Sequence, residues 1–447
     1  MIHRTSITLV LAALLAASCS PSAPRAPAPA ASHCVVADDA ARQRITFGVI
    51  GPLRVKGARP SSDAAAAQTY ETLVRVDCTG RAVPGLARTW SSGDGLHWQF
   101  DIRPGSTFTD GTPVTARSVA AALATLPMFA SVAAVGEYDL RLTLRSRGDV
   151  RLFADPELAV RRTSQSGAAG TGPYEPVFDP AGGVLRLLAR DGSPVAAEAG
   201  AGWTGSGRRD SVDAPPAPDT IVVEAFGADL REAIDAGVDV VVTHEDATIE
   251  YARARSGYSI APLTWSRTYV LATTRGPGSP TSPPSNAFPD ALVGAEARPA
   301  EPPFWWSGCS PAPSPGDPVA VAENRVLYQR GDQVARTIAE RIAALARGRA
   351  PAWLAAHFPD GGAPAAVGAG APELIDAVRA RSTLAIVIAL PRVQYGGCAA
   401  PSAELVEPLL AGWHLTPLVD TRDRLIHRTG IGHVTVDADG TIRFGRR

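Results

Sequence analysis

Residues 95–123 read GLHWQFDIRPGSTFTDGTPVTARSVAAAL, and their pattern determines how the surrounding chain is expected to fold. Apolar and polar residues alternate through His97–Ile102, which predicts a half-buried strand. The RPG of residues 103–105 predicts a turn, after which residues 107–108 are expected to pair back. The Asp-Gly of residues 110–111 predicts a second tight turn.

A helix is expected directly after these turns. Thr115 stands at the N-cap position, and the Ala-rich segment that follows predicts a helix from Ala116 to about Leu126. The stretch therefore predicts strand, turn, short strand, turn and capped helix. It contains no obvious catalytic set.

The first 19 residues, MIHRTSITLVLAALLAASC, have the form of a secretory signal peptide. Their apolar run is too short to remain as a membrane span, and no later stretch reaches about 18 apolar residues. The small residues before Cys19 resemble a bacterial lipoprotein box, which implies that Cys19 is lipidated and begins the mature chain. Ordinary cleavage, with Cys19 a bystander, is the alternative. Residues 20–43 begin with a Pro/Ala-rich segment and are expected to form a tether.

Four cysteines remain after Cys19, namely Cys34, Cys78, Cys309 and Cys398. An even number in an exported chain suggests two disulfides, and four cysteines allow three pairings. Proximity along the chain favours Cys34–Cys78 and Cys309–Cys398. Free buried thiols are the alternative. The absence of a C-x-x-C spacing gives no support to a zinc site or a thioredoxin-like site.

Charge and length narrow the class of protein. The net charge is −1 and the chain has no basic block, which argues against a nucleic-acid partner. A chain of 447 residues is long enough for two or more domains.

Other segments have recognisable periodicity. Residues 61–76 are expected to form a helix, and residues 219–242 a strand–helix–strand unit with a parallel pair of strands. A second helix is expected at residues 333–346. Further strands are expected at residues 44–51, 138–145, 183–189 and 384–390, and a terminal hairpin at residues 434–444.

Several segments together resemble the bacterial extracellular solute-binding proteins of family 5, the peptide and nickel receptors of ABC transporters. They are residues 70–74 (YETLV), 84–90 (PGLARTW), 94–103 (DGLHWQFDIR), 108–116 (FTDGTPVTA), 170–174 (GTGPY), 417–419 (PLV) and 437–440 (DADG). The segments between residues 84 and 116 are the most specific, because they match with the family's spacing over some thirty positions.

The resemblance implies an α/β protein with the two-lobed periplasmic-binding-protein type II fold and mixed β-sheets. It implies a first lobe at residues 44–267, with an inserted small subdomain at about 61–165, and a second lobe at residues 268–412. Residues 413–447 return to the first lobe. The second lobe is expected to be reduced, because TYVLATTR at residues 268–275 lacks the family's Asn and a Pro/Gly-rich segment at 276–318 replaces its V-R-Q-A helix.

Five residues are candidates for ligand binding. Trp265, Arg267 and Tyr269 fall at the expected first crossing between the lobes, where an arginine can bind a carboxylate with two parallel hydrogen bonds. Trp305 and Trp306 can form a stacking wall. The alternatives are a structural arginine, core aromatic residues, and tryptophans that fill a shortened lobe.

The expected function is that of a substrate-binding lipoprotein of an ABC transporter. Such a protein captures a small solute, such as an oligopeptide, between its lobes and delivers it to a membrane permease. It is expected to be monomeric, anchored by lipid in the periplasm or at the cell surface, and without a cofactor, a metal or a nucleic-acid partner. A non-transport lipoprotein with a sensory or structural role is the alternative.

An enzyme is not expected. The HED of residues 244–246 lacks the second histidine of the H-E-x-x-H zinc helix. Neither a G-x-S-x-G elbow nor an S-x-x-K set is present.

Overall fold

The computed structural model describes most of the chain after the tether. The described residues are 34–38, 44–50, 63–164, 167–178, 184–190, 218–227, 229–274, 283, 286–308, 323–347, 350–355, 357–358, 364–392, 409–410 and 412–444. In these ranges no helix is both long enough and apolar enough to cross a membrane.

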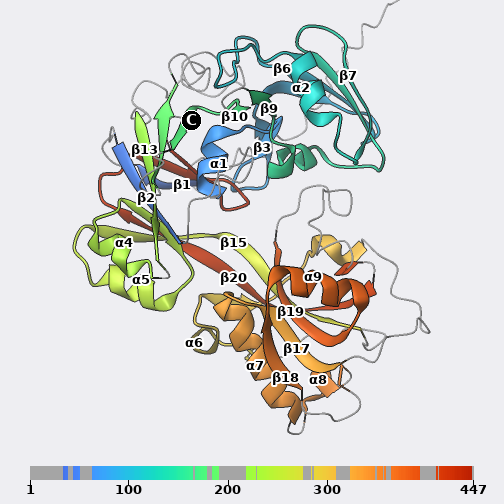
Figure 1. Cartoon of the computed structure of the whole chain (residues 1–447), viewed down its shortest axis with the longest axis vertical. Helices are drawn as coiled ribbons and strands as arrows, with labels where there is room; N and C mark the ends of the chain where they lie inside the picture. Colours follow the sequence, from blue (N-terminus) through green and yellow to red (C-terminus); the bar gives the residue numbers. More distant parts are fainter. Residues whose placement is uncertain are drawn as a thin grey trace, which may run out of the picture. The chain divides into compact units, whose positions relative to one another are not determined.

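A mixed sheet of eleven strands runs through the described part of the molecule, in the order β11-β12-β13-β2-β14-β20-β15-β19-β17-β18 with β16 also paired to β20. Its strands are β2 (Arg44–Ile50), β11 (Tyr174–Phe178), β12 (Val184–Ala189), β13 (Thr220–Phe226), β14 (Val240–Thr243), β15 (Tyr258–Thr273), β16 (Ala297–Pro299), β17 (Glu323–Gln329), β18 (Ala365–Ala369), β19 (Thr383–Pro391) and β20 (His414–Arg428). The long antiparallel strands β15 and β20 join the β2 end of this sheet to the β17 end (Figure 1).

The strand–helix–strand unit expected at residues 219–242 is present, but its strands do not pair with each other. The two strands β13 and β14 are both parallel to β2, which lies between them. The short helix α4 (Arg231–Asp235) connects them, and α5 (Asp246–Arg253) follows β14. A parallel arrangement was therefore correctly predicted, whereas the direct pairing was wrong because a strand from the start of the sequence inserts at that position.

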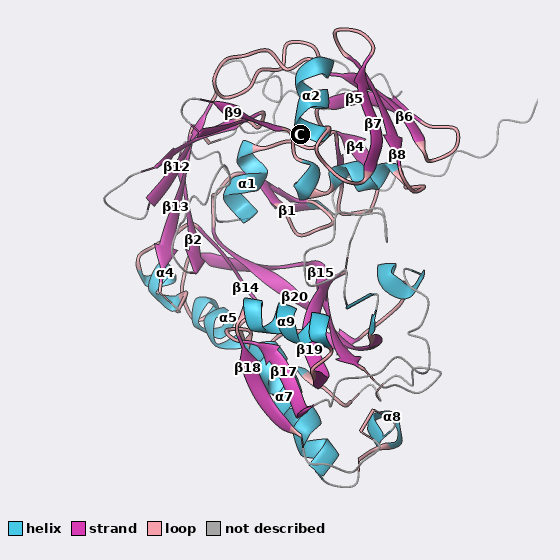
Figure 2. Cartoon of the chain, turned by 45° about the vertical axis from the view of Figure 1, so that its right-hand side comes forward, coloured by secondary structure: helices cyan, strands magenta, loops and turns pink. Residues whose placement is uncertain are grey.

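At the other end of the sheet, helices pack on two faces. Helix α7 (Gln333–Arg347), expected from its spacing, shares a buried cluster with Tyr269 and Leu271 of β15. Helix α9 (Ala371–Ala380) shares a different cluster with the alternate residues Val270 and Ala272. Because neighbouring strand residues face opposite ways, β15 is buried on both faces here. Figure 2 shows α7 and α9 beside this end of the sheet.

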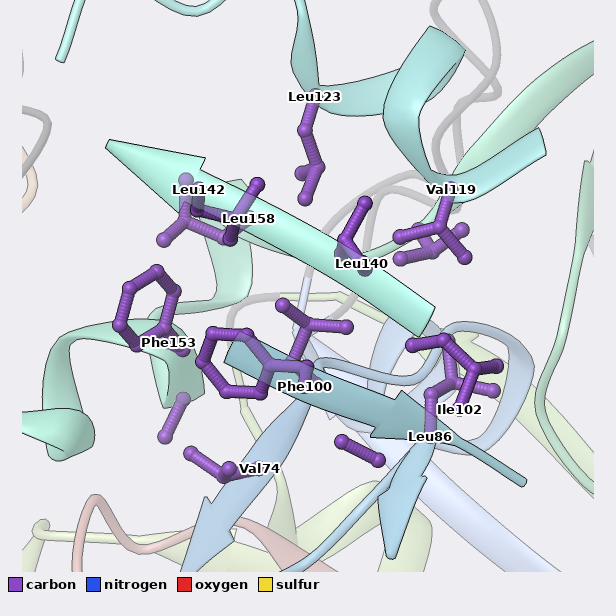
Figure 3. Close-up of a cluster of buried hydrophobic side chains, with 14 of the residues drawn as sticks. Val74, Leu86, Phe100, Ile102, Val119, Leu123, Leu140, Leu142, Phe153 and Leu158 are labelled. Carbon is purple, nitrogen blue, oxygen red and sulfur yellow. The ribbon is translucent and has the colours of Figure 1, made fainter. Parts of the chain in front are cut away.

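A separate four-stranded sheet, in the order β5-β6-β8-β7, contains the stretch that opened the sequence analysis. Its strands are β5 (Ala87–Ser91), β6 (His97–Ile102), β7 (Phe129–Ala134) and β8 (Asp139–Leu144). Trp98, Phe100 and Ile102 alternate with more exposed residues, which confirms the predicted half-buried strand. Phe100 and Phe153 pack edge to face in the cluster of Figure 3, with ring centroids 4.7 Å apart.

The predicted cap is also confirmed. Helix α2 (Ala116–Leu123) begins after Thr115, whose hydroxyl accepts a hydrogen bond from the Ser118 amide, and the helix ends three residues earlier than expected. The short segment at residues 107–108 does not pair back onto β6; Thr107 forms a bridge with Pro113 instead. The reason is that both edges of β6 are already occupied, by β5 and by β8.

The helix expected at residues 61–76 is much shorter than predicted. Helix α1 spans Asp63–Thr69, and the chain then extends into β3 (Val74–Val76), which pairs with β4 (Ala82–Pro84). The apolar residues do face inward as expected: Leu73 is 1% exposed and Val74 is fully buried. Their burial is achieved by a strand, because pairing with a later segment outweighs a helical periodicity.

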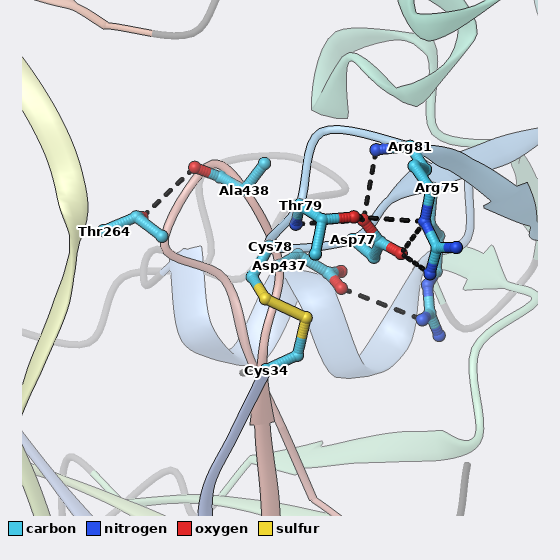
Figure 4. Close-up of a disulfide and its surroundings, with 9 residues drawn as sticks. All are labelled: Cys34, Arg75, Asp77, Cys78, Thr79, Arg81, Thr264, Asp437 and Ala438. Atoms are coloured by element: carbon cyan, nitrogen blue, oxygen red, sulfur yellow. Dashed lines mark hydrogen bonds and ion pairs between the residues drawn. A yellow bond between two sulfur atoms is a disulfide. The ribbon is translucent and has the colours of Figure 1, made fainter. Parts of the chain in front are cut away.

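The described end of the chain forms the predicted hairpin, and a disulfide lies beside it. Strand β21 (His433–Val436) pairs with β22 (Ile442–Phe444) on one side and with β1 (Val35–Asp38) on the other, in a three-stranded sheet. The predicted bond between Cys34 and Cys78 is present (Figure 4). Cys309 and Cys398 lie outside the described residues, so their pairing stays a prediction.

Candidate functional site

The three residues predicted at the first crossing lie on β15, but they do not share one face. Trp265 pairs with Arg422 of β20, and Arg267 pairs with Thr421, so the register shifts by one residue at Ser266. Directly paired residues lie on the same face of a sheet, and consecutive residues of β20 face opposite ways. The bulge at Ser266 therefore places Trp265 on one face and Arg267 on the other.

On the Arg267 face, an arginine and a histidine meet one carboxylate. Arg267 Nη1 lies 2.9 Å from Asp423 Oδ1, and His244 Nδ1 lies 3.4 Å from the same oxygen. Burial raises the pKa of Asp423, but the hydrogen bond from His244 and the charge of Arg267 outweigh burial and hold this pKa below its usual range. Arg267 thus has an internal partner, and its exposed fraction of 37% leaves part of the guanidinium accessible.

Tyr269 is a buried residue of the cluster around α7. It is 2% exposed, and its hydroxyl donates to Asp332 Oδ1 at 3.1 Å. Burial and the charge of Asp332 raise its pKa above the ordinary tyrosine value. The hydroxyl is therefore neutral and already has an acceptor, and a direct contact between Tyr269 and a ligand stays a prediction.

On the opposite face, two guanidinium groups pack against the ring of Trp265. Arg298 of β16 lies 4.5 Å from the ring centroid and Arg422 of β20 lies 4.6 Å from it. Both distances are in the range of cation–π attraction, which is strongest for tryptophan. The ring is half-buried. It therefore holds two arginines in place beside β15 and β20, here named the crossing strands.

On this face, the fully buried carboxylate of Asp420 accepts hydrogen bonds from several segments of the chain. Its oxygens accept from the Thr268 hydroxyl at 2.6 Å, from Arg392 Nη1 at 2.7 Å and from Arg298 Nε at 3.3 Å. The backbone N–H of Glu301 donates to the same group at 3.3 Å. Such a carboxylate is stable in the interior only because these donors replace water.

Sequence analysis did not identify this arginine network. Its members come from β16, β20 and the residue after β19, which are far apart in the sequence. One signal was present: Asp420, Arg422 and Arg424 alternate along one strand, so their side chains share a face. No comparable sequence pattern pointed to Arg298 on β16.

The two adjacent tryptophans have different surroundings. They begin the short helix η4 (Trp305–Gly308), and their rings are perpendicular with centroids 5.4 Å apart. Trp306 is 7% exposed and packs in the cluster that contains Trp413. Trp305 is half-buried and donates from Nε1 to the carbonyl of Pro391 at 2.7 Å. A stacking role for either ring stays a prediction.

Among the described residues, no group of three or more His, Cys, Asp or Glu side chains is arranged to hold a metal ion. The residues brought together at the crossing strands are arginines, carboxylates and one tryptophan. Such a set can bind a polar molecule by charge and stacking.

Residues 81–177 match the family model described as bacterial extracellular solute-binding proteins, family 5 Middle. The chain is also 35% identical over 72 residues to the nickel-binding periplasmic protein of Escherichia coli, an alignment that covers 16% of this chain and 14% of that protein. The sequence alignment thus spans far less than two thirds of that relative.

Similarity in structure extends over nearly the whole fold. The solved structure of NikZ from Campylobacter jejuni aligns with a TM-score of 0.60 at 13% identity, covering 90% of this chain and 97% of that one. The murein tripeptide binding protein MppA of Escherichia coli aligns with a TM-score of 0.57 at 14% identity, covering 87% and 95%. At these identities the likeness concerns the fold, which confirms the expected two-lobed type II architecture. The chain is thus similar to the bacterial extracellular solute-binding proteins of family 5 in sequence over residues 81–177, and to NikZ and MppA in fold.

Proposed function

We propose that this protein is the solute-binding component of an ABC importer, which captures a small solute and delivers it to a permease. In this proposal residues 44–267 form the first lobe, residues 268–412 the second, and residues 413–447 return to the first. The arrangement of β15 and β20 is the main support. These paired strands connect the two ends of the sheet, where different clusters are buried.

Strands of this kind suit a protein that closes around a solute. Hinge motions are absorbed by a few residues at the ends or irregularities of connecting elements. The register of β15 against β20 shifts between Pro262 and Trp265, between Trp265 and Arg267, and between Tyr269 and Val270. The partly exposed guanidiniums of Arg267 and Arg298 lie beside these irregularities. The solute is therefore proposed to bind at the middle of β15.

The experiment that tests this proposal is native mass spectrometry of the full chain purified gently from its host. An additional mass that recurs between preparations and is lost on denaturation is expected. A panel of oligopeptides and of nickel with histidine should then give a saturable thermal shift for one class. A clean mass, with no shift across the panel, would instead favour a non-transport lipoprotein with a sensory or structural role.

Membrane attachment is proposed through lipid on Cys19, followed by the tether of residues 20–43. The Cys19→Ser variant is expected to appear in the soluble extracytoplasmic fraction and to incorporate no labelled palmitate. The unchanged chain should be labelled and should sediment with membranes. Equal labelling of the two proteins would exclude Cys19 as the lipidated residue. Size-exclusion chromatography of the variant is expected to give the mass of a monomer.

A further inference from the structure

Strand β7 is an outer strand of the four-stranded sheet and carries no charge. Residues 129–135, which contain it, read FASVAAV, without a charged residue or a proline. Four of the six residues of β7 are exposed, and the Val135 side chain that follows is 52% exposed. An exposed, uncharged outer strand is a surface on which another strand can pair.

The backbone of β7 has hydrogen-bonding groups that point away from its own sheet. The Val135 N–H donates to the Asp139 carbonyl at 2.8 Å, across the turn into β8. Hydrogen-bonded positions alternate along an antiparallel pair, so Ala133 also bonds to β8, whereas Val132 and Ala134 direct their N–H and C=O groups to the open side. Among the described residues, no other strand, loop or side chain bonds to Val132 or Ala134 there.

The other outer strands of the two largest described sheets have features that oppose such pairing. Strand β5 contains the charged Arg88, and β11 contains Glu175 and Pro176. On β18, the Gly368 carbonyl already accepts from Arg330 Nη2 at 3.0 Å. Charges and prolines on outer strands, and groups that cover them, are the usual means of preventing association. Strand β7 lacks these features.

From this arrangement we propose that β7 pairs antiparallel with β7 of a second copy of the chain, across a two-fold axis at Ala133. Val132 of each copy then lies opposite Ala134 of the other, and the outward N–H and C=O groups of both residues bond to each other. A second copy is the partner that this strand fits, because a two-fold axis places each residue near its own equivalent. An uncharged strand can pair in this way without opposing like charges.

The charges around the strand are compatible with the pairing. Ala133 lies beside Arg141 of β8. The two copies of Arg141 would be three strand spacings apart, about 14 Å, which exceeds the screening length of about 8 Å in physiological salt. At each end, Glu137 of one copy would approach the segment of the other copy where Arg145 Nε donates to the Pro127 carbonyl at 2.8 Å. Opposite charges thus come together at both ends of the paired strands.

The proposed contact is small. One short strand on each copy buries less than the roughly 1,000 Å² of a stable interface, so the pairing is weak. The chain is therefore monomeric in dilute solution and pairs where its local concentration is high. This surface lies outside the proposed solute site, and the pairing does not depend on the proposed function.

Disulfide cross-linking of the full chain tests the two-fold axis. The two copies of Ala133 would form a pair without hydrogen bonds, with Cα atoms about 4.5 Å apart, which is within the range for a disulfide. Oxidation of Ala133→Cys with copper phenanthroline at high protein concentration should therefore give at least about tenfold more covalent dimer than oxidation of Ser91→Cys. Ser91 is exposed on β5, the opposite outer strand of the same sheet. The unchanged chain gives the background from its own five cysteines.

Sedimentation equilibrium of two further variants tests the pairing without a cross-link. Ala134→Pro removes an N–H that points away from β8, so the sheet should persist while the dimer weakens at least about tenfold. Ala133→Lys places like charges directly opposite each other and should weaken the dimer about fivefold. Ser91→Lys is the matched control and should leave it unchanged. Circular dichroism and a thermal melt establish that each variant is folded.

Three results would overturn the proposal. They are equal cross-linking of Ala133→Cys and Ser91→Cys, an average mass that does not rise with the concentration of the unchanged chain, and equal weakening by Ala133→Lys and Ser91→Lys. Cross-linking of Ala133→Cys in cells to a different protein, with no covalent dimer, would also reject a second copy as the partner.

Discussion

Two regions of the molecule reach a similar degree of burial by different routes. In the cluster around β6 and β8, here named the β6–β8 core, every buried member except Ala438 lies within residues 73–169. The cluster around α7, here named the α7 core, takes its buried members from Tyr269 to Val419. The first is thus assembled largely within one continuous stretch, and the second from segments separated by up to about 150 residues.

This difference in sequence separation explains in which core the local sequence patterns predicted the structure correctly. In the β6–β8 core, alternation, turns and a capped helix follow one another, and their partners are close in sequence. The match to the family model, at residues 81–177, also falls largely in this region. Around β15 and β20, each strand has two neighbours from distant parts of the chain, and a single bulge changes which residues meet. The β6–β8 core should therefore respond to mutation as a local unit.

The largest effect is expected from Phe100→Ala. Phe100 is fully buried and contacts the ring of Phe153, so its truncation should cost about 4 kcal/mol in the free energy of unfolding. Hydrogen exchange should show lost protection in residues 71–170 while α7 stays protected. Val135→Ala, at a side chain that is 52% exposed, is the control and should change stability by less than about 0.5 kcal/mol. Simultaneous loss of protection in α7 would contradict the view of two separable regions.

The next effect concerns the buried ion pair of the same region. Arg103 Nη2 lies 3.1 Å and 3.2 Å from the two carboxylate oxygens of Glu71, and both residues are buried. Glu71→Gln leaves the Arg103 charge without its counter-charge and should cost about 3 kcal/mol in urea unfolding. Arg88→Gln breaks the more exposed pair with Asp101 and should cost less than about 1 kcal/mol. Equal costs would mean that burial of the pair has no energetic consequence.

A smaller loss is expected at the carboxylate of the crossing strands. Asp420→Asn keeps the shape of the side chain but removes the charge that Arg298 and Arg392 share, and it should cost about 2 kcal/mol. The cost is smaller than for Glu71 because the arginines retain other acceptors, including Glu301. Asp376→Asn, on the exposed side of α9, is the control for loss of one carboxylate. A change no larger than in this control would show that Asp420 does not stabilise the network.

The smallest predicted effect is a gain in stability. Burial raises the pKa of Asp155 to about 6, and the charges of Glu157 and Asp439 act in the same direction. A folded-state pKa above the unfolded value means that this group stabilises the fold most below about pH 4 and that the contribution is lost as pH rises through 6. Asp155→Asn should therefore be more stable than the unchanged chain at pH 7, by about 1 kcal/mol after allowance for partial exposure.

The measurement for Asp155 is urea unfolding at pH 4 and pH 7. Asn retains an oxygen that can accept from the Glu157 amide, as Asp155 does at 2.9 Å, so the short turn should persist. The two proteins should have equal stability at pH 4. A variant that is less stable at pH 7 would show that the charged carboxylate is favourable in the fold.

Several elements were predictable because their signal is local. The strand at His97–Ile102, the cap at Thr115 and helix α7 follow from spacing alone. The Cys34–Cys78 bond followed from proximity in the chain and from the prediction that the chain is exported. The predicted helix over residues 61–76 was partly wrong, because pairing between β3 and β4 cannot be read from the periodicity of one segment.

The candidate site was less accessible to sequence reasoning. The sequence indicated Trp265, Arg267 and Tyr269 as one set, because they fall at the expected first crossing between the lobes. The bulge at Ser266 separates Trp265 from the other two, and a bulge depends on the register with a strand about 150 residues away. Asp420 was also missed, since its importance comes from the donors around it.

By itself the sequence determined that this is an α/β chain with a segment similar to family 5. It also predicted one disulfide correctly, together with the main strands and helices of the local units. Only the tertiary structure decided which face each residue of β15 presents and which charges meet there. The physical reason is that hydrophobic periodicity acts over a few residues, whereas register, burial and ion pairing are set by contacts between distant segments.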